Sequence, residues 1–514
     1  MVEAVLIAAT SPMPATPIDY SDVQALVRYG YGGLTEACFL LLKIENPSAA
    51  RSWLATVDVS CAVEMKPPPA TALQVAFSSQ GLQALGLPAA IIQGFSAEFV
   101  SGMASEASRS RRLGDVGANA PGGWNWGGPA NTPDVLLALY AKEHCLEDYK
   151  QLLTGTLRDA GFRLLDCLKT ANLDGFEPFG FRDGISQPQI DWGQNRTMNG
   201  KDQLEYGNLL SLGEFLLGYP NEYGKYTDRP LLHPQQDLAG KLLPAEDQPH
   251  KKDLGRNGTY LVFRQLQQDV RGFWQFLDQQ ANSNPDERRN LAEFMVGRTM
   301  SGTPLVPTSS LAIPGVGHNP EDVRLNRFTY ESDPEGVRCP FGAHVRRSNP
   351  RNADLPHGTH GFIFHLVRVL GFGRKSMRND LMASARFHRV LRRGREYGTT
   401  LLPEEAVERG GTVEEERGLH FICLNANIAR QFEFIQNAWI MGTKFDGLTE
   451  ESDPLLGNRD PIPGCSMTDA FSIPQQNGLR RRITGIPQFV TVRGGAYFFL
   501  PSLRALRYLS SLGN

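Results

Sequence analysis

The stretch GFRDGISQP, residues 180–188, places an aspartate between two glycines, with an arginine before it and a proline soon after it. A simple turn explains this pattern, because glycine adopts positive φ freely and Asp-Gly is a common turn dipeptide. The fragment alone favours that interpretation. Whether the Asp183 carboxylate has a further role depends on the rest of the chain.

The bulk composition is typical of a globular protein with ordinary surface charge. The chain has 514 residues, of which 41% are hydrophobic, and Lys+Arg 52 against Asp+Glu 55 gives a net charge of −3. This length predicts two or more cores, or one large fold of two related halves. The charge balance favours neither nucleic acid nor an anionic membrane as a partner.

The cysteines and the N-terminal residues bear on cofactor attachment and on location. The 7 cysteines form no CxxC pair, which argues against zinc ribbons, thioredoxin chemistry and covalent attachment of c-type haem. Scattered thiols fit a reducing compartment, and the first residues make a poor signal peptide. We therefore expect a cytoplasmic protein without a membrane span.

Strands and helices mix in both halves of the chain without regular βαβ spacing, which predicts the α+β class. Predicted strands occupy residues 37–44, 72–77, 134–141, 162–170, 258–269, 418–426 and 489–502, the last interrupted by Gly494-Gly495. Predicted helices include a short one capped by Ser79, and others after residues 141, 269, 284 and 426. The similar order in each half suggests an internal duplication.

The domain organisation follows from these elements and from a long polar segment between them. We expect an N-terminal arm over residues 1–30 and a first domain over 31–191. Residues 192–257 are rich in proline, glycine and charge, and are interpreted as a bridging loop or insertion. The second domain is expected over 258–514.

Histidines are the next candidates, since GxSxG, HExxH, Walker A and GxGxxG motifs are absent. HGTHGFIFH, residues 357–365, is better interpreted as a surface loop than as a metal site. His344, in VRCPFGAHVRRSNPR (337–351), follows an apolar run and is a candidate axial ligand for haem iron. Arg346, Arg347 and Arg351 could pair with haem propionates. The alternative is a buried structural histidine beside a basic surface strand.

A third segment, FHRVLRRGREYG (387–398), contains Arg392 and Arg393 before a glycine turn. Such a basic run is usually a solvated surface, but it could also direct one arginine inward. His388 lies four residues before Arg392, and a histidine with an arginine is another way to build a peroxidase pocket.

Four segments together resemble the dye-decolourising peroxidases. They are FGFRDGISQP, CPFGAHVRRSNPR, LRRGREYG and VTVRGGAYFFLPS, in the family's order over roughly residues 175–502. The size resembles that of the larger members. The resemblance implies two ferredoxin-like α+β domains with antiparallel sheets, and non-covalent haem b held in the C-terminal half.

The resemblance also implies roles for single residues. Asp183 matches the distal acid–base aspartate, His344 the proximal iron ligand, and Arg392 the distal arginine, although the longer spacing leaves open which of Arg392 and Arg393 faces the iron. The family has no distal histidine, which argues against His388. The implied activity is reduction of hydrogen peroxide with oxidation of dyes and phenols, with an acidic optimum. The alternative function is a haem carrier without turnover.

Two finer expectations concern partners of the haem site. A proximal histidine usually donates its second N–H to an acceptor, for which Asn427 and Glu433 are candidates, although an ordinary helix surface explains them equally well. Tyr397 follows Arg392 by five residues and is a candidate surface oxidation site for bulky donors, the alternative being a loop anchor.

Overall fold

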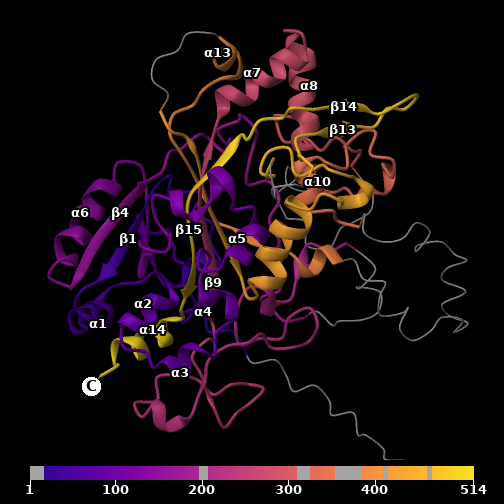
Figure 1. The fold of residues 1–514 in the computed structure, drawn as a ribbon. Coiled ribbons are helices and arrows are strands. Elements are labelled where there is room, and N and C mark those ends of the chain that lie inside the picture. The colour runs from indigo at the N-terminus through magenta and orange to yellow at the C-terminus, as the bar shows by residue number, and fades with distance from the viewer. Residues whose placement is uncertain are drawn as a thin grey trace, which may run out of the picture.

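A computed structural model describes residues 17–195, 206–308, 324–352, 384–408, 415–459 and 466–513. In this part of the chain one nine-stranded antiparallel sheet runs through the middle of the molecule (Figure 1). Its order is β10-β12-β9-β15-β2-β3-β1-β4, with β11 also paired to β12. The first half of the chain supplies one end of this sheet, and the second half supplies the other.

The first half forms a ferredoxin-like unit. Its strands are β1 (Glu36–Ile44), β2 (Thr71–Phe77), β3 (Val135–Ala141) and β4 (Phe162–Lys169), paired in the order β2-β3-β1-β4. Helix α1 (Pro47–Thr56) follows β1, and α6 (Leu146–Leu157) joins β3 to β4. The four strands predicted for this half are therefore confirmed, and β4 is an edge strand.

The second half repeats this order. Its strands are β9 (Thr259–Gln268), β10 (Leu391–Arg392), β11 (Arg395–Tyr397), β12 (Gly418–Asn425) and β15 (Val490–Leu500). Here β12 lies between β10/β11 and β9, as β3 lies between β2 and β1, and β15 takes the place of β4. The two units join where Phe499 of β15 pairs with Phe77 of β2. The predicted duplication is confirmed, whereas the exact domain boundaries stay a prediction.

Both faces of the sheet are buried along its central strands, which explains the continuous apolar runs in those strands. Successive residues of a strand point to opposite faces, so Leu40 and Leu42 enter one core while Phe39 and Leu41 enter the other. The first core also receives the apolar sides of α7 (Val270–Gln280) and α8 (Pro285–Val296), which lie together at the top of Figure 1.

Three local predictions differ in detail from the structure. Ser78, not Ser79, caps α2 (Ser79–Ala84), because its side chain accepts from the Gly81 N–H. The helix expected after β12 consists of two π-helical segments, Ala429–Glu433 and Ile435–Ile440. The Gly494-Gly495 pair does not break β15, although the register of β15 against β9 shifts just before it, between Val492 and Gly494, and a Cβ at Gly494 would lie 2.5 Å from the Trp126 ring.

The remaining described elements are short or peripheral. They are α3 (Ala89–Ile92), α4 (Ala97–Ser101), α5 (Ala107–Leu113), α10 (His344–Ser348), α13 (Pro403–Val407), α14 (Leu503–Ser510), β5 (Gln189–Ile190), β6 (Leu209–Leu210), β7 (Leu231–Leu232), β8 (Lys252–Asp253), β13 (Phe471–Ile473) and β14 (Arg481–Ile483). The histidine-rich segment 357–365 lies outside the described residues.

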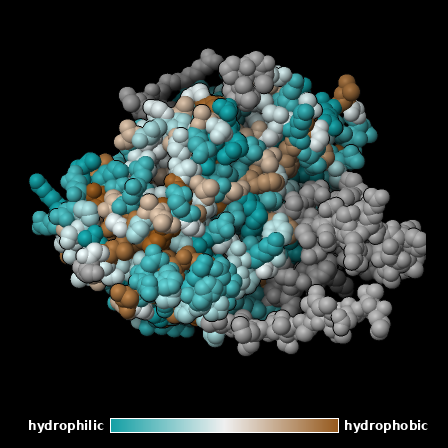
Figure 2. Space-filling view, turned by 60° about the horizontal axis from the view of Figure 1, so that its bottom comes forward, coloured by the Kyte–Doolittle hydropathy of each residue, from teal (hydrophilic) through white to brown (hydrophobic). Residues whose placement is uncertain are grey.

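The surface mixes polar and apolar side chains. On the face drawn in Figure 2, hydrophilic residues cover most of the described area and small apolar patches lie between them. Within the described residues no helix combines the length and the apolar character that crossing a membrane requires.

Candidate active site

A cavity of about 310 Å³ lies beside the sheet of the second half. Its apolar wall includes Leu266 of β9, Phe421 of β12 and Val492 of β15, and its other side includes residues of α10 and of the π-helical segments. Asp183, His344 and Arg392 all line it. Tertiary folding thus brings together the three residues that the sequence motifs singled out.

The Asp183 loop is a turn that also presents a carboxylate to the cavity. Gly180 and Gly184 adopt φ of 95° and 74°, in the region that favours glycine, and the Asp183 N–H donates to the Gly175 carbonyl at 2.9 Å. About a third of the Asp183 side chain is exposed to the cavity. Asp183 therefore lies in a turn and also lines the cavity, so both interpretations of this stretch are correct.

Arg392 reaches Asp183 from strand β10. Its Nη1 donates to Asp183 Oδ1 at 2.8 Å, and its backbone pairs with Cys423 of β12. The neighbouring Arg393 points elsewhere, because its guanidinium donates to the carbonyls of Leu26 and Val27. The structure therefore places Arg392, and not Arg393, on the cavity.

Two further side chains, which the sequence did not single out, hold these groups in place. Gln187 binds both backbone groups of Arg392, accepting from its N–H at 3.0 Å and donating to its carbonyl at 3.2 Å. Glu177 accepts from the N–H groups of Phe179 and Phe181 and so braces the chain that leads into Asp183. Burial raises the pKa of Glu177 to about 7.

The electrostatic setting keeps Asp183 ionised. Burial raises the pKa of the Asp183 carboxyl. The charge of Arg392, a backbone hydrogen bond from Gly184 and the hydrogen bond from Arg392 lower this pKa, and together they outweigh burial. The net result is a pKa below the ordinary aspartate value. A carboxylate beside a fixed cation is therefore available to accept a proton.

His344 is the first residue of α10, and a buried aspartate orients its ring. Nδ1 of His344 lies 2.9 Å from Oδ2 of Asp453, whose side chain is 0% exposed. The other carboxylate oxygen, Oδ1, accepts from the N–H groups of Leu455 and Leu456. Because Nδ1 is engaged, Nε2 is the ring nitrogen left to bind a ligand in the cavity.

Asn427 and Glu433, the acceptors considered from sequence, do not contact this ring. Glu433 Oε1 accepts from the Tyr497 hydroxyl and pairs with Arg109. Asn427 Oδ1 accepts from the Arg430 N–H. The acceptor is Asp453 instead, which is 109 residues from His344 in sequence.

Comparison with known proteins adds to this geometry. No family model matches the chain. The dye-decolorizing peroxidase msp1 of Mycetinis scorodonius is 29% identical over 466 residues, covering 86% of this chain and 77% of that protein. Peroxidase 2 of the same fungus is 30% identical over 467 residues, covering 85% and 76%. This chain belongs to the dye-decolourising peroxidase family.

A solved structure agrees with that assignment. The fungal DyP-type peroxidase of Auricularia auricula-judae aligns with a TM-score of 0.68 and 25% identity, covering 97% of this chain and 100% of that one. The protein described here is accordingly a peroxidase with the duplicated ferredoxin-like fold.

The arginines next to His344 do not face the cavity of this peroxidase. Arg346 donates to Asp333 and to the Cys339 carbonyl, and Arg347 donates to the carbonyls of Trp439, Gly442 and Glu451; neither lines the cavity. Val345 and Ser348 line the cavity together with His344, and at about 100° per residue Arg346 and Arg347 fall on the other side of α10. The alternative interpretation from sequence placed a basic surface strand here, whereas the segment forms helix α10 and both arginines are buried.

Other arginines of the peroxidase reach the cavity instead. Arg351 and Arg389 line it, and the buried Nε of Arg351 has no hydrogen-bond partner among the described residues. Arg351 Nη1 donates to the carbonyls of Asn326 and Phe328, while Arg389 donates to the Tyr206 hydroxyl at 2.8 Å. These contacts hold two cations at the cavity wall.

His388 also lines the cavity but is engaged by the protein. Its Nδ1 contacts the Arg430 carbonyl, and its ring stacks on Phe434 with centroids 3.6 Å apart. Burial lowers the pKa of His388 to about 4, so the imidazole is neutral.

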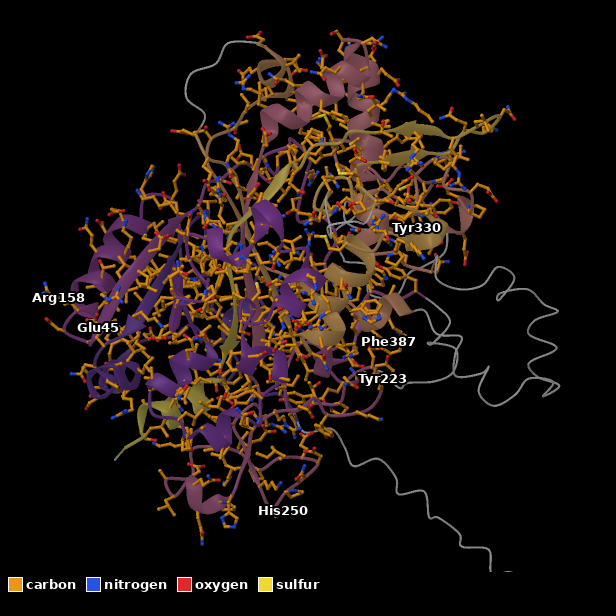
Figure 3. The ribbon with its side chains drawn as sticks, viewed as in Figure 1. Glu45, Arg158, Tyr223, His250, Tyr330 and Phe387 are labelled. Atoms are coloured by element: carbon orange, nitrogen blue, oxygen red, sulfur yellow. The ribbon has the colours of Figure 1, made fainter. Side chains whose placement is uncertain are left out.

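Phe387, the residue before His388, stacks on Tyr223, and Figure 3 places this pair on the same side of the molecule as Tyr330.

Tyr397 is less accessible than a surface oxidation site would be. It is 8% exposed, its ring stacks on His420, and its hydroxyl donates to Glu416 at 3.0 Å. The expectation that this ring lies near the surface is therefore wrong, because pairing of β11 with β12 draws it against the sheet.

Proposed function

We propose that this peroxidase holds non-covalent haem b in the cavity, with His344 as the iron ligand, and reduces hydrogen peroxide while oxidising dyes and phenols. The observation that carries the proposal is that an Asp183–Arg392 pair and an Asp453-oriented His344 line one largely apolar cavity. The names of the relatives support the same activity.

The residues around the cavity fit haem in two respects. Apolar side chains of β9, β12 and β15 suit a flat hydrophobic ring, and the Nε2 of His344 suits the iron. Arg351, whose Nε has no hydrogen-bond partner among the described residues, and Arg389 are the cavity arginines suited to the propionates, rather than Arg346 or Arg347. When bound, haem supplies the two-electron redox chemistry.

The chain supplies the proton transfer and the compensating charge. The Asp183 carboxylate accepts the proton from one peroxide oxygen and delivers it to the other, so that water is the leaving group. Arg392 stabilises the negative charge that develops as the O–O bond lengthens. Because the Asp183 pKa is lowered, its carboxylate remains ionised into the acid range, which supports an acidic optimum.

The direct test is an absorption spectrum of the purified protein, followed by peroxide and then by a dye at acid pH. We expect a haem spectrum that changes on peroxide addition and returns as dye is consumed. A haem carrier would show the same initial spectrum but no dye oxidation. Absence of haem after reconstitution would contradict the cofactor assignment.

The Asp453→Asn variant tests how His344 is oriented. Asparagine keeps the shape of the side chain but removes the charge that holds Nδ1–H, so we expect haem affinity or peroxide reactivity to fall about 10–100-fold. Haem titration and the ferric spectrum measure this effect.

Glu433→Gln is the matched control, because Glu433 contacts Tyr497 and Arg109 and not His344. Its haem affinity and ferric spectrum should stay close to those of the unmodified protein. Equal losses in both variants would contradict a specific role for Asp453.

A further inference from the structure

Two cysteines lie next to each other on the last two strands of the sheet, and neither of them lines the cavity. Cys38 is on β1 and Cys167 is on the edge strand β4, which Figure 1 shows at the left with α6, opposite α10. Figure 3 labels Glu45, just after β1, and Arg158, just after α6, on this side, whereas Tyr330 and Phe387 are on the other side. The thiols therefore belong to a separate place in the fold.

The strand register brings the two side chains to the same face. Cys38 pairs with Lys169 and Leu40 pairs with Cys167, so the cysteines are diagonal neighbours across the β1–β4 ladder. The two thiols also interact with each other by a side-chain hydrogen bond. Both cysteines are free in the structure.

The two thiols differ in accessibility. Cys38 is 1% exposed and belongs to the core, whereas Cys167 is half-buried on a strand that has one neighbour among the described strands of the sheet. A small oxidant can reach Cys167 from the edge, and Cys38 can react only through Cys167.

Charge and hydrogen bonding favour the thiolate at Cys167. The Cys38 hydrogen bond lowers the pKa of Cys167, and although burial opposes this, Lys150 and Lys169 lower it further. The pKa of Cys38 is raised, because it is hydrogen-bonded to Cys167 and is buried, so Cys38 stays a thiol.

The acidic groups nearby do not cancel this effect. Asp166, next to Cys167, raises its pKa, and Glu147 of α6 pairs with Lys150 at 2.6 Å. Even so, the pKa of Cys167 remains below that of an ordinary thiol. A thiolate is the nucleophilic form of cysteine.

We propose that Cys167 and Cys38 form a peroxide-reactive thiol pair, in which hydrogen peroxide oxidises Cys167 and Cys38 resolves the product to a reversible disulfide between β4 and β1. The oxidant is the peroxide that the proposed function takes as substrate, yet the reaction needs neither haem nor the cavity residues.

The chemistry balances in two steps. The Cys167 thiolate attacks one peroxide oxygen, the O–O bond breaks, and hydroxide leaves and becomes water on taking a proton, which oxidises the sulfur to a sulfenic acid. The Cys38 sulfur then attacks the Cys167 sulfur, the S–O bond breaks, and a second water leaves. Two thiols and one peroxide thus give one disulfide and two waters.

The second step requires a small movement of β4. Diagonal neighbours in a ladder have Cα atoms about 7–8 Å apart, slightly more than most disulfides span. Among the described strands β4 pairs with β1 alone, although the carbonyl of its last residue, Lys169, contacts His420 Nε2 of β12, and its register with β1 shifts between Leu41 and Leu42. These features leave β4 room for a small shift against β1.

The test treats the full-length protein with hydrogen peroxide in the absence of a reducing donor and maps its cysteines by mass spectrometry. We expect a linked Cys38–Cys167 peptide lacking two hydrogens, which dithiothreitol reverses. In Cys38→Ser, dimedone should instead trap a sulfenic acid on Cys167. In Cys167→Ser, neither product should form, and Cys38 should remain a thiol.

Cys61 and Cys145 are internal controls, because both are half-buried like Cys167. Iodoacetamide should alkylate Cys167 of the unmodified protein with a midpoint below about pH 8.5, the value of a free thiol, and faster at neutral pH than either control. This measurement needs no variant to fold.

Equal alkylation of Cys61, Cys145 and Cys167, together with an unlinked Cys38 and no dimedone adduct, would overturn the proposal. Repeating the peroxide treatment in Asp183→Asn, where haem turnover should consume less peroxide, keeps the oxidant available to the thiols. The readout is the mass of cysteine-containing peptides, so a missing disulfide would leave the haem peroxidase proposal intact. Conversely, a protein without peroxidase activity could still form the disulfide.

Discussion

Replacing His344 with alanine is expected to remove most of the bound haem. The His344 ring is oriented by Asp453 and lines the cavity, and its Nε2 is the nitrogen that the structure leaves for an iron ligand. Haem content per protein and the ferric absorption spectrum measure the loss. Full haem content with an unchanged spectrum would reject His344 as the ligand.

His388→Ala is the matched control for this experiment. His388 lines the same cavity, but its Nδ1 contacts the Arg430 carbonyl and its ring stacks on Phe434. We therefore expect this variant to keep its haem and its reaction with peroxide. A larger loss in His388→Ala than in His344→Ala would exchange the roles of the two histidines.

The second large effect is expected at the distal pair. Asp183→Asn and Arg392→Leu should retain haem but react slowly with peroxide, because the first removes the proton acceptor and the second removes the cation beside it. General acid–base catalysis contributes about 10²–10⁴-fold, so a stopped-flow loss of that order is expected in at least one of them.

Arg393→Leu is the control for Arg392→Leu. Arg393 is adjacent in sequence but donates to Leu26 and Val27, away from the cavity. Its folded, haem-loaded form should react with peroxide at nearly the normal rate. Near-normal rates in both Asp183→Asn and Arg392→Leu would remove this pair from the mechanism.

The pH dependence gives a further test of the same pair. In the unmodified protein the Asp183 pKa is lowered despite burial, so the rate should fall only when the pH drops through a value below about 3.9, that of ordinary aspartate. In Arg392→Leu the raising effect of burial remains without the main opposing charge, so the pKa should rise. The acid limb of the peroxide rate should then move to higher pH.

This shift is measured from peroxide reaction rates over a pH series. Arg393→Leu should keep the acid limb of the unmodified protein. An acid limb that stays in place in Arg392→Leu would mean that Asp183 is not the group whose protonation limits the reaction.

Much of the fold could be predicted from the sequence, because local patterns carry it. Strand β1 is a continuous apolar run bounded by polar residues, and β9 leads into an amphipathic helix with Asp269 as its cap. The glycines around Asp183 indicated a turn, and both glycines indeed adopt positive φ. Such features depend on residues close together in the chain, and the motifs around Asp183, His344 and Arg392 are equally local.

Only the tertiary structure decided which residues far apart in sequence come into contact, and in which direction some side chains point. Asp453 and His344 are 109 positions apart, and Gln187 and Arg392 are 205 apart, so no local pattern links either pair. Arg346 and Arg347 were expected at the cavity, but His344, Val345 and Ser348 form the cavity side of α10, and the helical rotation of about 100° per residue leaves both arginines on its other side. The sequence by itself singled out the residues that we propose carry the chemistry, and the packing of distant segments decided which neighbours orient them.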